Sequence, residues 1–256
     1  MGDLFSIRGK TALVTGGSRG IGEMIVRGFV DAGVKVYISS RKADVCEALA
    51  EELRDQGGDA TALPADLSTE PACAALAGEL EGREAALDIL VNNAGATWGA
   101  PLEEFDEAAW ERVLSLNVKG VFFTTRYLLP LLEAASRPDE PARVINIGSI
   151  DGVRAPTLET YSYSASKAAV HMLTRHLAKR LAPRVTVNAI APGPFPSKMM
   201  RSTLEAFGDQ IAAAAPMKRI GRAPDMAGAA IYLASPAASY VTGAVLPVDG
   251  GIATLS

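Results

Sequence analysis

The stretch Thr11–Gly22, TALVTGGSRGIG, decides the fold class of this chain. Its first five residues are mostly apolar or β-branched and predict a buried strand. The glycines Gly16, Gly20 and Gly22 then lead into a helical pattern that runs to about Ala32. A glycine loop between a strand and a helix lets the backbone approach a pyrophosphate, and the helix N-terminus supplies free N–H groups. We therefore predict a dinucleotide-binding loop; the alternative is a glycine-rich turn without a ligand.

The same alternation of strand and helix continues along the chain. Apolar or β-branched runs predict further strands at Val34–Ser39, Asp59–Leu63, Leu87–Val91, Arg143–Ile147, Val185–Ile190 and Ala244–Val248. Pro247 marks the last strand as an edge strand or as the end of a strand. Repeated strand–helix–strand order is typical of a doubly wound α/β fold, a parallel sheet with helices on both faces. No linker-like segment divides residues 1–256, so a single domain is predicted.

Composition and charge exclude several other classes of protein. The 256 residues carry a net charge of −4, so no basic excess favours nucleic acid or an anionic membrane as a partner. The N-terminal segment lacks the apolar core of a signal peptide, and no stretch approaches the ~20 apolar residues of a membrane span. Cys46 and Cys73 stand far apart, which favours two free thiols and gives no metal-like spacing. We expect a cytoplasmic protein without a metal site.

The residues after the second predicted strand bear on which nicotinamide cofactor is bound. An acidic residue there would hold the adenosine ribose hydroxyls and favour NAD. Here the sequence at 39–42 is SSRK, and no carboxylate occurs before Asp44. The guanidinium of Arg41, helped by Arg19 in the glycine loop, matches the geometry of a 2′-phosphate. We predict NADPH over NADH; the alternative is that both arginines are ordinary surface bases.

Two further segments follow predicted strands, at the edge where an open α/β sheet places its ligand. Asp66 and Leu67 come after the third strand, where Asp66 would cap the next turn or contact the adenine. The sequence NNAG, Asn92–Gly95, closes the fourth strand. Small and amide residues there suit a backbone packed close to the cofactor, whereas a plain turn is the alternative.

Tyr163 and Lys167 form the first candidate catalytic pair. They stand four residues apart in a helical pattern, so they lie on one face about one turn apart. A tyrosine alone has a pKa of ~10 and is a poor acid–base catalyst at neutral pH. A nearby cation stabilises the phenolate, so we expect Lys167 to lower the pKa of Tyr163 and make it a usable general acid. Such a pair is also common between purely structural neighbours.

Two polar residues join this pair as candidates. Ser149 follows the fifth predicted strand, at the edge of the sheet where the ligand is expected, and its hydroxyl is suited to hydrogen-bond a substrate carbonyl. Asn117 falls inside a long helical stretch, where a polar amide holds a water or marks a kink. The alternative for Asn117 is a core amide satisfied by protein partners.

Together these residues resemble the short-chain dehydrogenase/reductase family over essentially the whole chain. The resemblance rests on motifs in a fixed order: TGGSRGIG at 15–22, NNAG at 92–95, Asn117, Ser149, Tyr163 with Lys167, Pro192-Gly193, and VTG followed by VDGG at 241–251. The glycine spacing G-x-x-x-G-x-G departs from the general G-x-G-x-x-G fingerprint and fits this family.

The resemblance implies a Rossmann-like sheet of seven strands in the order 3-2-1-4-5-6-7. It implies that Tyr163 protonates the carbonyl oxygen as hydride arrives and that Lys167 binds the nicotinamide ribose and tunes Tyr163. Ser149 would polarise the carbonyl, and Asn117 would anchor a water in a proton relay. Tyr161 is a decoy, because no lysine stands four residues after it. The residues expected to bind NADP(H) are Gly16, Ser18, Arg19, Gly20, Ile21, Gly22, Ser40, Arg41, Asp66, Leu67, Asn93, Ala94, Gly95, Tyr163, Lys167, Pro192 and Gly193.

This family builds a substrate lid in the segment that here spans about 193–222. Five side chains would give a helix there a flexible apolar face: Met199, Met200, Leu204, Phe207 and Ile211. That face would form an acyl-binding groove or simply pack in the core. Family members usually carry a threonine near the nicotinamide carboxamide, and the nearest hydroxyl here is that of Ser197.

Within the family, the sequence is most similar to the 3-oxoacyl thioester reductases, especially those of the rhamnolipid-synthesis type. Trp98-Gly99, Ala142–Ser149 and Pro194–Ser197 carry this closer similarity. It implies reduction of a 3-oxoacyl chain held by an acyl carrier protein or by CoA. Two rivals stay open: an alcohol, polyol or other small-ketone dehydrogenase with the same site, and a non-catalytic cofactor-sensing protein. The family commonly forms homodimers or homotetramers, so we expect a homo-oligomer.

Overall fold

Seven strands build one parallel sheet in the described part of the chain, which comprises residues 4–198, 200–253 and 255 of this computed structural model. The strands lie in the order β3-β2-β1-β4-β5-β6-β7, and every neighbouring pair is parallel. They are β1 Thr11–Thr15, β2 Lys35–Ser39, β3 Ala60–Ala62, β4 Ile89–Asn92, β5 Ala142–Ile147, β6 Val185–Pro192 and β7 Val245–Val248. The predicted doubly wound fold and its strand order are confirmed.

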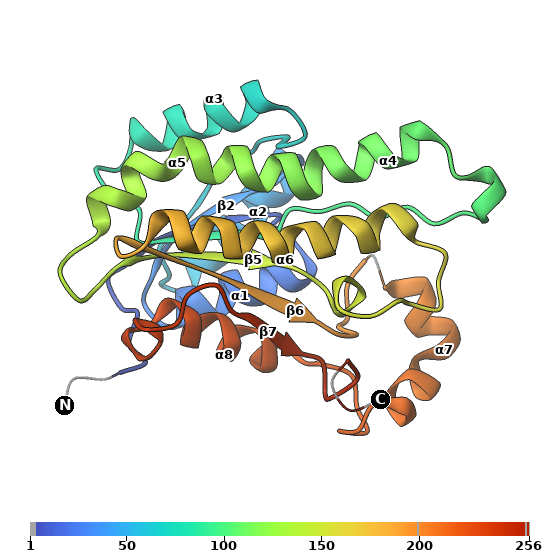
Figure 1. Cartoon of the computed structure of the whole chain (residues 1–256). Helices are drawn as coiled ribbons and strands as arrows, with labels where there is room; N and C mark the ends of the chain where they lie inside the picture. Colours follow the sequence, from blue (N-terminus) through green and yellow to red (C-terminus); the bar gives the residue numbers. More distant parts are fainter. Residues whose placement is uncertain (1–3, 199, 254, 256) are drawn as a thin grey trace.

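Helices cover both faces of the sheet, as Figure 1 shows. One face carries α3 Glu70–Glu81, α5 Val121–Ala135 and α6 Tyr161–Leu181. The other carries α1 Gly20–Asp31, α2 Ala43–Asp55 and α8 Ala223–Ala234. The helix α4 Glu107–Leu114 continues through a π-helical segment, Ser115–Gly120, into α5. The helix α7 Arg201–Ala214, orange in Figure 1, lies beyond the arrowheads of β6 and β7, and none of its residues is buried.

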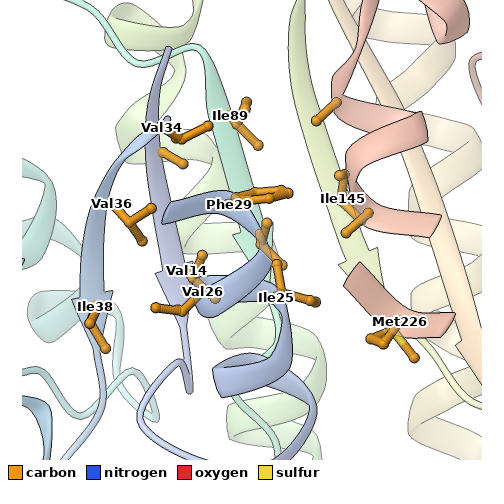
Figure 2. Packing of buried hydrophobic residues seen from close by; sticks show 14 of the residues in the cluster. Val14, Ile25, Val26, Phe29, Val34, Val36, Ile38, Ile89, Ile145 and Met226 are labelled. Atoms are coloured by element: carbon orange, nitrogen blue, oxygen red, sulfur yellow. The ribbon is translucent and has the colours of Figure 1, made fainter. Parts of the chain in front are cut away.

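The strands are apolar on both sides because helices cover both faces of the sheet. In β1, Val14 points into the cluster beneath α1, α2 and α8, whereas Leu13 points into the cluster beneath α3, α5 and α6. Figure 2 shows the first cluster, in which Phe29 of α1 lies above the strands and Met226 of α8 lies on the side of Ile145. These two cores hold the carboxyl ends of the strands in one line, where the candidate site lies.

The ends of several strands differ from the predicted ones by one or two residues. β4 extends to Asn92 because that residue pairs with Asn146, and β6 extends to Pro192 because that residue pairs with Val248. Strand ends depend on such ladder partners, which lie far away in the sequence. The edge position predicted from Pro247 is confirmed, since β7 is the last strand of the sheet.

Both cysteines are buried free thiols, and they lie in different clusters, Cys46 in the first and Cys73 in the second. In residues 4–198, 200–253 and 255, no helix is both long and apolar enough to cross a membrane. Over the same residues, no group of histidine, cysteine, aspartate and glutamate side chains is arranged to hold a metal ion.

Candidate active site

The glycine loop between β1 and α1 forms a cradle that side chains would fill. Gly16 and Gly20 have φ values of +62° and +58°, which L side chains rarely adopt. A Cβ on Gly16 would lie 2.7 Å from Nδ2 of Asn93, and a Cβ on Gly22 would overlap the carbonyl oxygen of Gly16. Only glycines allow the backbone this close approach, as the predicted binding loop requires.

The side chains of Asn93 and Thr15 hydrogen-bond the glycine loop to the end of β4. Asn93 donates through Nδ2 to the carbonyl oxygens of Thr15 and Gly16, at 2.9 and 3.0 Å. The Thr15 hydroxyl accepts the backbone N–H groups of Asn93 and Ala94, both at 3.0 Å. The NNAG segment thus packs directly against the glycine loop, whereas its predicted closeness to the cofactor stays a prediction. The role of Thr15 was missed, because its hydroxyl meets partners that lie about 78 residues away.

The N-terminus of α1 is open to an anion. Arg19 precedes the helix in extended conformation and makes no side-chain cap, so the first N–H groups are free for a ligand. The hydroxyls of Ser18 and Ser40 lie 2.8 Å apart and join the glycine loop to the end of β2. Arg19 and Arg41 are exposed, and neither forms an ion pair within the described residues. These features fit the phosphates of a dinucleotide. The glycine loop has no room for Cβ atoms, the N-terminus of α1 is free, and the guanidinium groups of Arg19 and Arg41 are unpaired within the described residues.

Removing the Arg41 guanidinium is expected to weaken NADPH binding without affecting NADH binding. A charge-assisted hydrogen bond contributes about 1.5–3 kcal/mol, so the Kd of NADPH should rise about 10- to 100-fold in Arg41→Ala. The Kd of NADH should stay within about twofold, because NADH lacks the 2′-phosphate. Fluorescence titration of both cofactors measures this, with Arg83→Ala, two residues after the end of α3, as the exposed control. Equal weakening of both cofactors would refute the assignment of Arg41.

Ser149 and Tyr163 come together at the carboxyl end of β5. Ser149 lies two residues after the strand and is buried, and its oxygen accepts the backbone N–H of Asp151 at 3.1 Å. That bond occupies an acceptor position, so the hydroxyl hydrogen is available for another oxygen. The Ser149 hydroxyl interacts with the phenol of Tyr163 and acts to lower its pKa. The predicted meeting of these two groups is found.

Lys167 does not lower the pKa of Tyr163 as expected. Burial is the dominant cause and raises the pKa of Tyr163 to about 12, and the charge of Asp151 adds to the increase. Lys167 instead lies over the face of the phenol ring, with Nζ 5.5 Å from its centroid, and donates to the carbonyl oxygen of Ile147 at 2.7 Å. Because burial disfavours its charge, the pKa of Lys167 falls to about 8.

Asn117 lies in the π-helical segment between α4 and α5, a local irregularity that is frequent at functional sites. Its oxygen accepts the N–H of Ala96 at 2.8 Å, and its Nδ2 donates to the Ala96 carbonyl and to the Ser166 hydroxyl, both at 2.9 Å. The amide is therefore satisfied by protein partners. Because both amide hydrogens are occupied, the side chain ties the segment after β4 to α6, and a water held by Asn117 would have to bind its main chain.

His171 is a site residue that the sequence did not reveal. It lies on α6 four residues after Lys167, is 5% exposed, and its Nε2 has no hydrogen-bond partner. A Cβ on Gly148 would overlap Nε2, and a Cβ on Gly152 would lie 2.9 Å from the imidazole Cε1. The ring therefore packs against both ends of the turn that carries Ser149. Burial lowers the pKa of His171, which favours the neutral ring. Its position could have been inferred from the sequence, because Tyr163, Lys167 and His171 follow one another at intervals of four residues on one face of α6.

Asp151 was also missed. It lies in the short 3₁₀ segment Ile150–Gly152 and its carboxylate is partly buried, which raises its pKa. Its charge acts on both Tyr163 and Lys167. The decoy Tyr161 differs from Tyr163 as expected: it is exposed, and its hydroxyl donates to Glu159 at 2.9 Å.

Asp66, Leu67 and Gly193, three further residues predicted to bind the cofactor, follow the carboxyl ends of β3 and β6. The side chain of Leu67 points into the core instead of towards the site. Asp66 is exposed and accepts the N–H of Ser68 at 3.2 Å, so it caps a turn, while the Leu67 side chain lies in the core. Gly193 packs against Asp249, where a Cβ would lie 2.7 Å from the Asp249 Cβ. Ser197 lies beside the glycine loop, with its Cβ 3.1 Å from where a Cβ on Gly20 would be.

The predicted apolar face of α7 is only partly present in the structure. Leu204 and Ile211 are half-buried and Phe207 is 54% exposed, so this face is not core. Met200 immediately precedes the helix, and Met199 lies outside the described residues. The core-packing alternative is therefore wrong for α7.

Comparison with known proteins agrees with this geometry. A family model described as "Enoyl-(Acyl carrier protein) reductase" matches residues 16–253. The chain is 49% identical to the rhamnolipids biosynthesis 3-oxoacyl-[acyl-carrier-protein] reductase of Pseudomonas aeruginosa, over 96% of this chain and 97% of that protein. It is 40% identical to galactitol 2-dehydrogenase (L-tagatose-forming) of Cereibacter sphaeroides, over 97% and 96%.

Solved structures of similar proteins cover nearly the whole chain. The Pseudomonas aeruginosa RhlG/NADP active-site complex superposes with a TM-score of 0.94 at 48% identity, over 99% of this chain and 100% of that one. The gluconate 5-dehydrogenase of Burkholderia cenocepacia in complex with NADP and tartrate gives a TM-score of 0.92 at 34% identity, over 99% of both chains.

Proposed function

This chain belongs to the short-chain dehydrogenase/reductase family, and we propose from this that it is an NADPH-dependent reductase that converts a 3-oxoacyl thioester into the 3-hydroxyacyl product. The observation that carries the proposal is the meeting of Ser149, Tyr163 and Lys167 beside the glycine cradle. The 3-oxoacyl substrate is supported by the Pseudomonas aeruginosa relative that is named for it. NADPH is supported by the unpaired Arg19 and Arg41 and by the NADP complexes of similar proteins.

In this proposal each residue of the site has a defined role. NADPH, when bound, supplies the hydride. Ser149 donates its hydroxyl hydrogen to the substrate carbonyl, because its own oxygen is already held by the Asp151 N–H. Tyr163 gives its phenolic proton to the oxygen as negative charge develops there. Lys167 stabilises the phenolate left behind and holds ribose hydroxyls of the cofactor. Asn117 fixes the segment after β4 against α6, and a water on its main chain would return the proton through Lys167.

The raised pKa of Tyr163 suits the direction of reduction. With a pKa of about 12, the phenol stays protonated at every physiological pH and can act as an acid. Lys167, with a pKa of about 8, loses its positive charge as the pH rises through that value. We therefore expect kcat/KM for reduction to fall above about pH 8. A rate profile that stays flat from pH 7 to pH 10 would contradict this role of Lys167.

Adding a methyl group at Gly148 is expected to reduce kcat by about tenfold or more. The new Cβ overlaps the imidazole of His171, so the turn that carries Ser149 must move, and displacement of a catalytic group is costly. The double variant Gly148→Ala/His171→Ala should recover part of that activity, because it removes the overlapping ring. Gly78→Ala on α3, where a Cβ meets nothing within 4 Å, is the control. A double variant no better than Gly148→Ala would show that His171 does not position the turn.

The second candidate function is a polyol or other small-ketone dehydrogenase, favoured by the 40% identity to galactitol 2-dehydrogenase. It uses the same site, so only the substrate separates the two. NADPH oxidation is to be measured with 3-oxoacyl thioesters, sugar ketones and simple ketones. Binding of NADPH without turnover of any of these would instead favour a cofactor-sensing protein.

We also propose a substrate lid, an acyl carrier, an oligomeric state and a location for the protein. The segment 193–222 with α7 forms a lid over the bound substrate, supported by the exposed apolar Phe207. The acyl chain arrives on an acyl carrier protein or on CoA. The protein forms a homo-oligomer, as a dimer or a tetramer, through exposed apolar side chains such as Phe122 of α5 and Met172 of α6. A cytoplasmic location is supported by the two unpaired cysteines.

A further inference from the structure

A cavity of about 490 Å³ lies between the segment before α4 and the segment that leads into α6. Its size is in the range typical of small-molecule sites. Its apolar lining comes from Leu102, Phe105 and Trp110 on one side and from Pro156, Leu158 and Tyr161 on the other.

Packed aromatic rings form part of the cavity wall. Phe105 packs edge-on against Trp110 and against Tyr161, with ring centroids 6.0 and 5.4 Å apart. Leu102 and Leu158 at its rim are 62% and 57% exposed. Apolar side chains gathered in an open concave surface are typical of a binding site, because a ligand would cover them.

One wall of the cavity belongs to the chain that connects the two candidate catalytic groups. The segment 153–160 runs from the turn that carries Ser149 to the start of α6, which carries Tyr163. Ser164, the neighbour of Tyr163, also lines the cavity, and its buried hydroxyl has no hydrogen-bond partner. The cavity is therefore built on the same segment that positions the chemistry.

Charge at the cavity favours a neutral occupant. Among its lining residues, all of which are described, none is charged. The charged neighbours of lining residues in the sequence include the acidic Glu103, Glu104 and Glu159 and the basic Arg154, so the balance of charge disfavours a sugar acid. None of the predicted α7 residues Leu204, Phe207 and Ile211 lines the cavity, so it is separate from the lid face.

We propose that this cavity holds the distal part of the acyl chain of the substrate and sets the preferred chain length. The inference rests on the proposed reduction of a 3-oxoacyl thioester and locates its apolar tail on the side of α4 and α6 rather than under α7. Each methylene buried in an apolar site is worth about 0.8 kcal/mol, so a chain that reaches the cavity gains several-fold in kcat/KM per carbon.

The test compares 3-oxoacyl N-acetylcysteamine thioesters of four and ten carbons, with NADPH and the full chain. We expect the wild type to prefer the ten-carbon substrate. Leu158→Asp, which adds a charge, and Leu158→Trp, which fills the cavity, should lower the ratio of ten-carbon to four-carbon kcat/KM about tenfold or more. Four-carbon turnover by these variants reports that they are folded. Phe207→Asp on α7 tests the alternative location of the tail under the lid, and Tyr240→Asp, at a fully exposed side chain, is the matched control; we expect both to leave the ratio within about twofold.

Three results would overturn the inference. An unchanged ratio in both Leu158 variants, with a lowered ratio in Phe207→Asp, would place the acyl chain under α7. Conversion of an oligomer into a smaller species by Leu158→Asp, measured by sedimentation, would identify the cavity as a subunit interface. Turnover of sugar ketones but of neither thioester would overturn the proposed function itself, which the first two results leave intact.

Discussion

Tyr163→Phe is expected to lower kcat for carbonyl reduction by about 10³-fold while leaving NADPH binding within about twofold. The phenol is the acidic group whose own oxygen interacts with the Ser149 hydroxyl at the carboxyl end of β5. Its loss removes general acid catalysis, which typically contributes 10²- to 10⁴-fold. The ring itself remains, so its packing against Lys167 and the shape of the crevice are kept.

Tyr161→Phe is the matched control for this change, because it removes the same hydroxyl two residues away. That hydroxyl donates to Glu159 at the surface, so its loss should leave kcat within about twofold. Steady-state kinetics with NADPH and a 3-oxoacyl thioester, together with fluorescence titration of NADPH, give both quantities. Near-normal kcat in Tyr163→Phe would rule out Tyr163 as the acid.

Lys167→Met is expected to lower activity by about 100-fold or more and, at the same time, to stabilise the fold at pH 7. The loss of activity follows from the proposed task of Lys167, whose ammonium lies over the Tyr163 ring where the phenolate would form. The gain in stability follows from burial, since the folded state lowers the pKa of Lys167 from 10.5 to about 8. That shift corresponds to a cost of about 3 kcal/mol for keeping the charge buried at neutral pH. The lost hydrogen bond to Ile147 offsets about 1 kcal/mol, so a net gain of about 2 kcal/mol is expected.

The pH dependence of this gain has a definite sign. The pKa of Lys167 is lower in the folded state than in the unfolded chain, so the unfolded chain binds more protons between about pH 8 and pH 10.5. The stability of the wild type with respect to this group therefore rises with pH over that interval. The advantage of Lys167→Met should be complete below about pH 8 and vanish towards pH 10.5. Urea unfolding at pH 7 and pH 10 measures it, with the exposed Lys179→Met as control. A variant less stable than the wild type at pH 7 would contradict the buried-charge argument.

The parts that could be predicted depend on local spacing or on the topology of a parallel sheet. Thr11–Gly22 specified strand, glycine loop and helix within twelve residues. Tyr163 and Lys167 share a helix face because they are four residues apart. Ser149 could be placed beside them because the carboxyl ends of parallel strands meet at one edge.

The parts that could not be predicted depend on burial and on contacts between distant segments. The predicted direction of the Tyr163 pKa shift was wrong because burial of the phenol, which depends on tertiary packing, is the dominant cause and raises that pKa. The packing of His171 against Gly148 requires the relative placement of α6 and β5, which the sequence pattern does not contain. The cavity beside Phe105 and Tyr161 likewise arises from two loops that are about 50 residues apart in the chain.

The most direct test of this account is the rate of NADPH oxidation by the purified full chain with a 3-oxoacyl thioester, compared with a sugar ketone such as 5-ketogluconate and with NADH in place of NADPH. We predict that kcat/KM is at least about tenfold higher for the thioester than for the sugar ketone, and higher with NADPH than with NADH. Turnover of the sugar ketone at an equal or greater kcat/KM, or a clear preference for NADH, would contradict it.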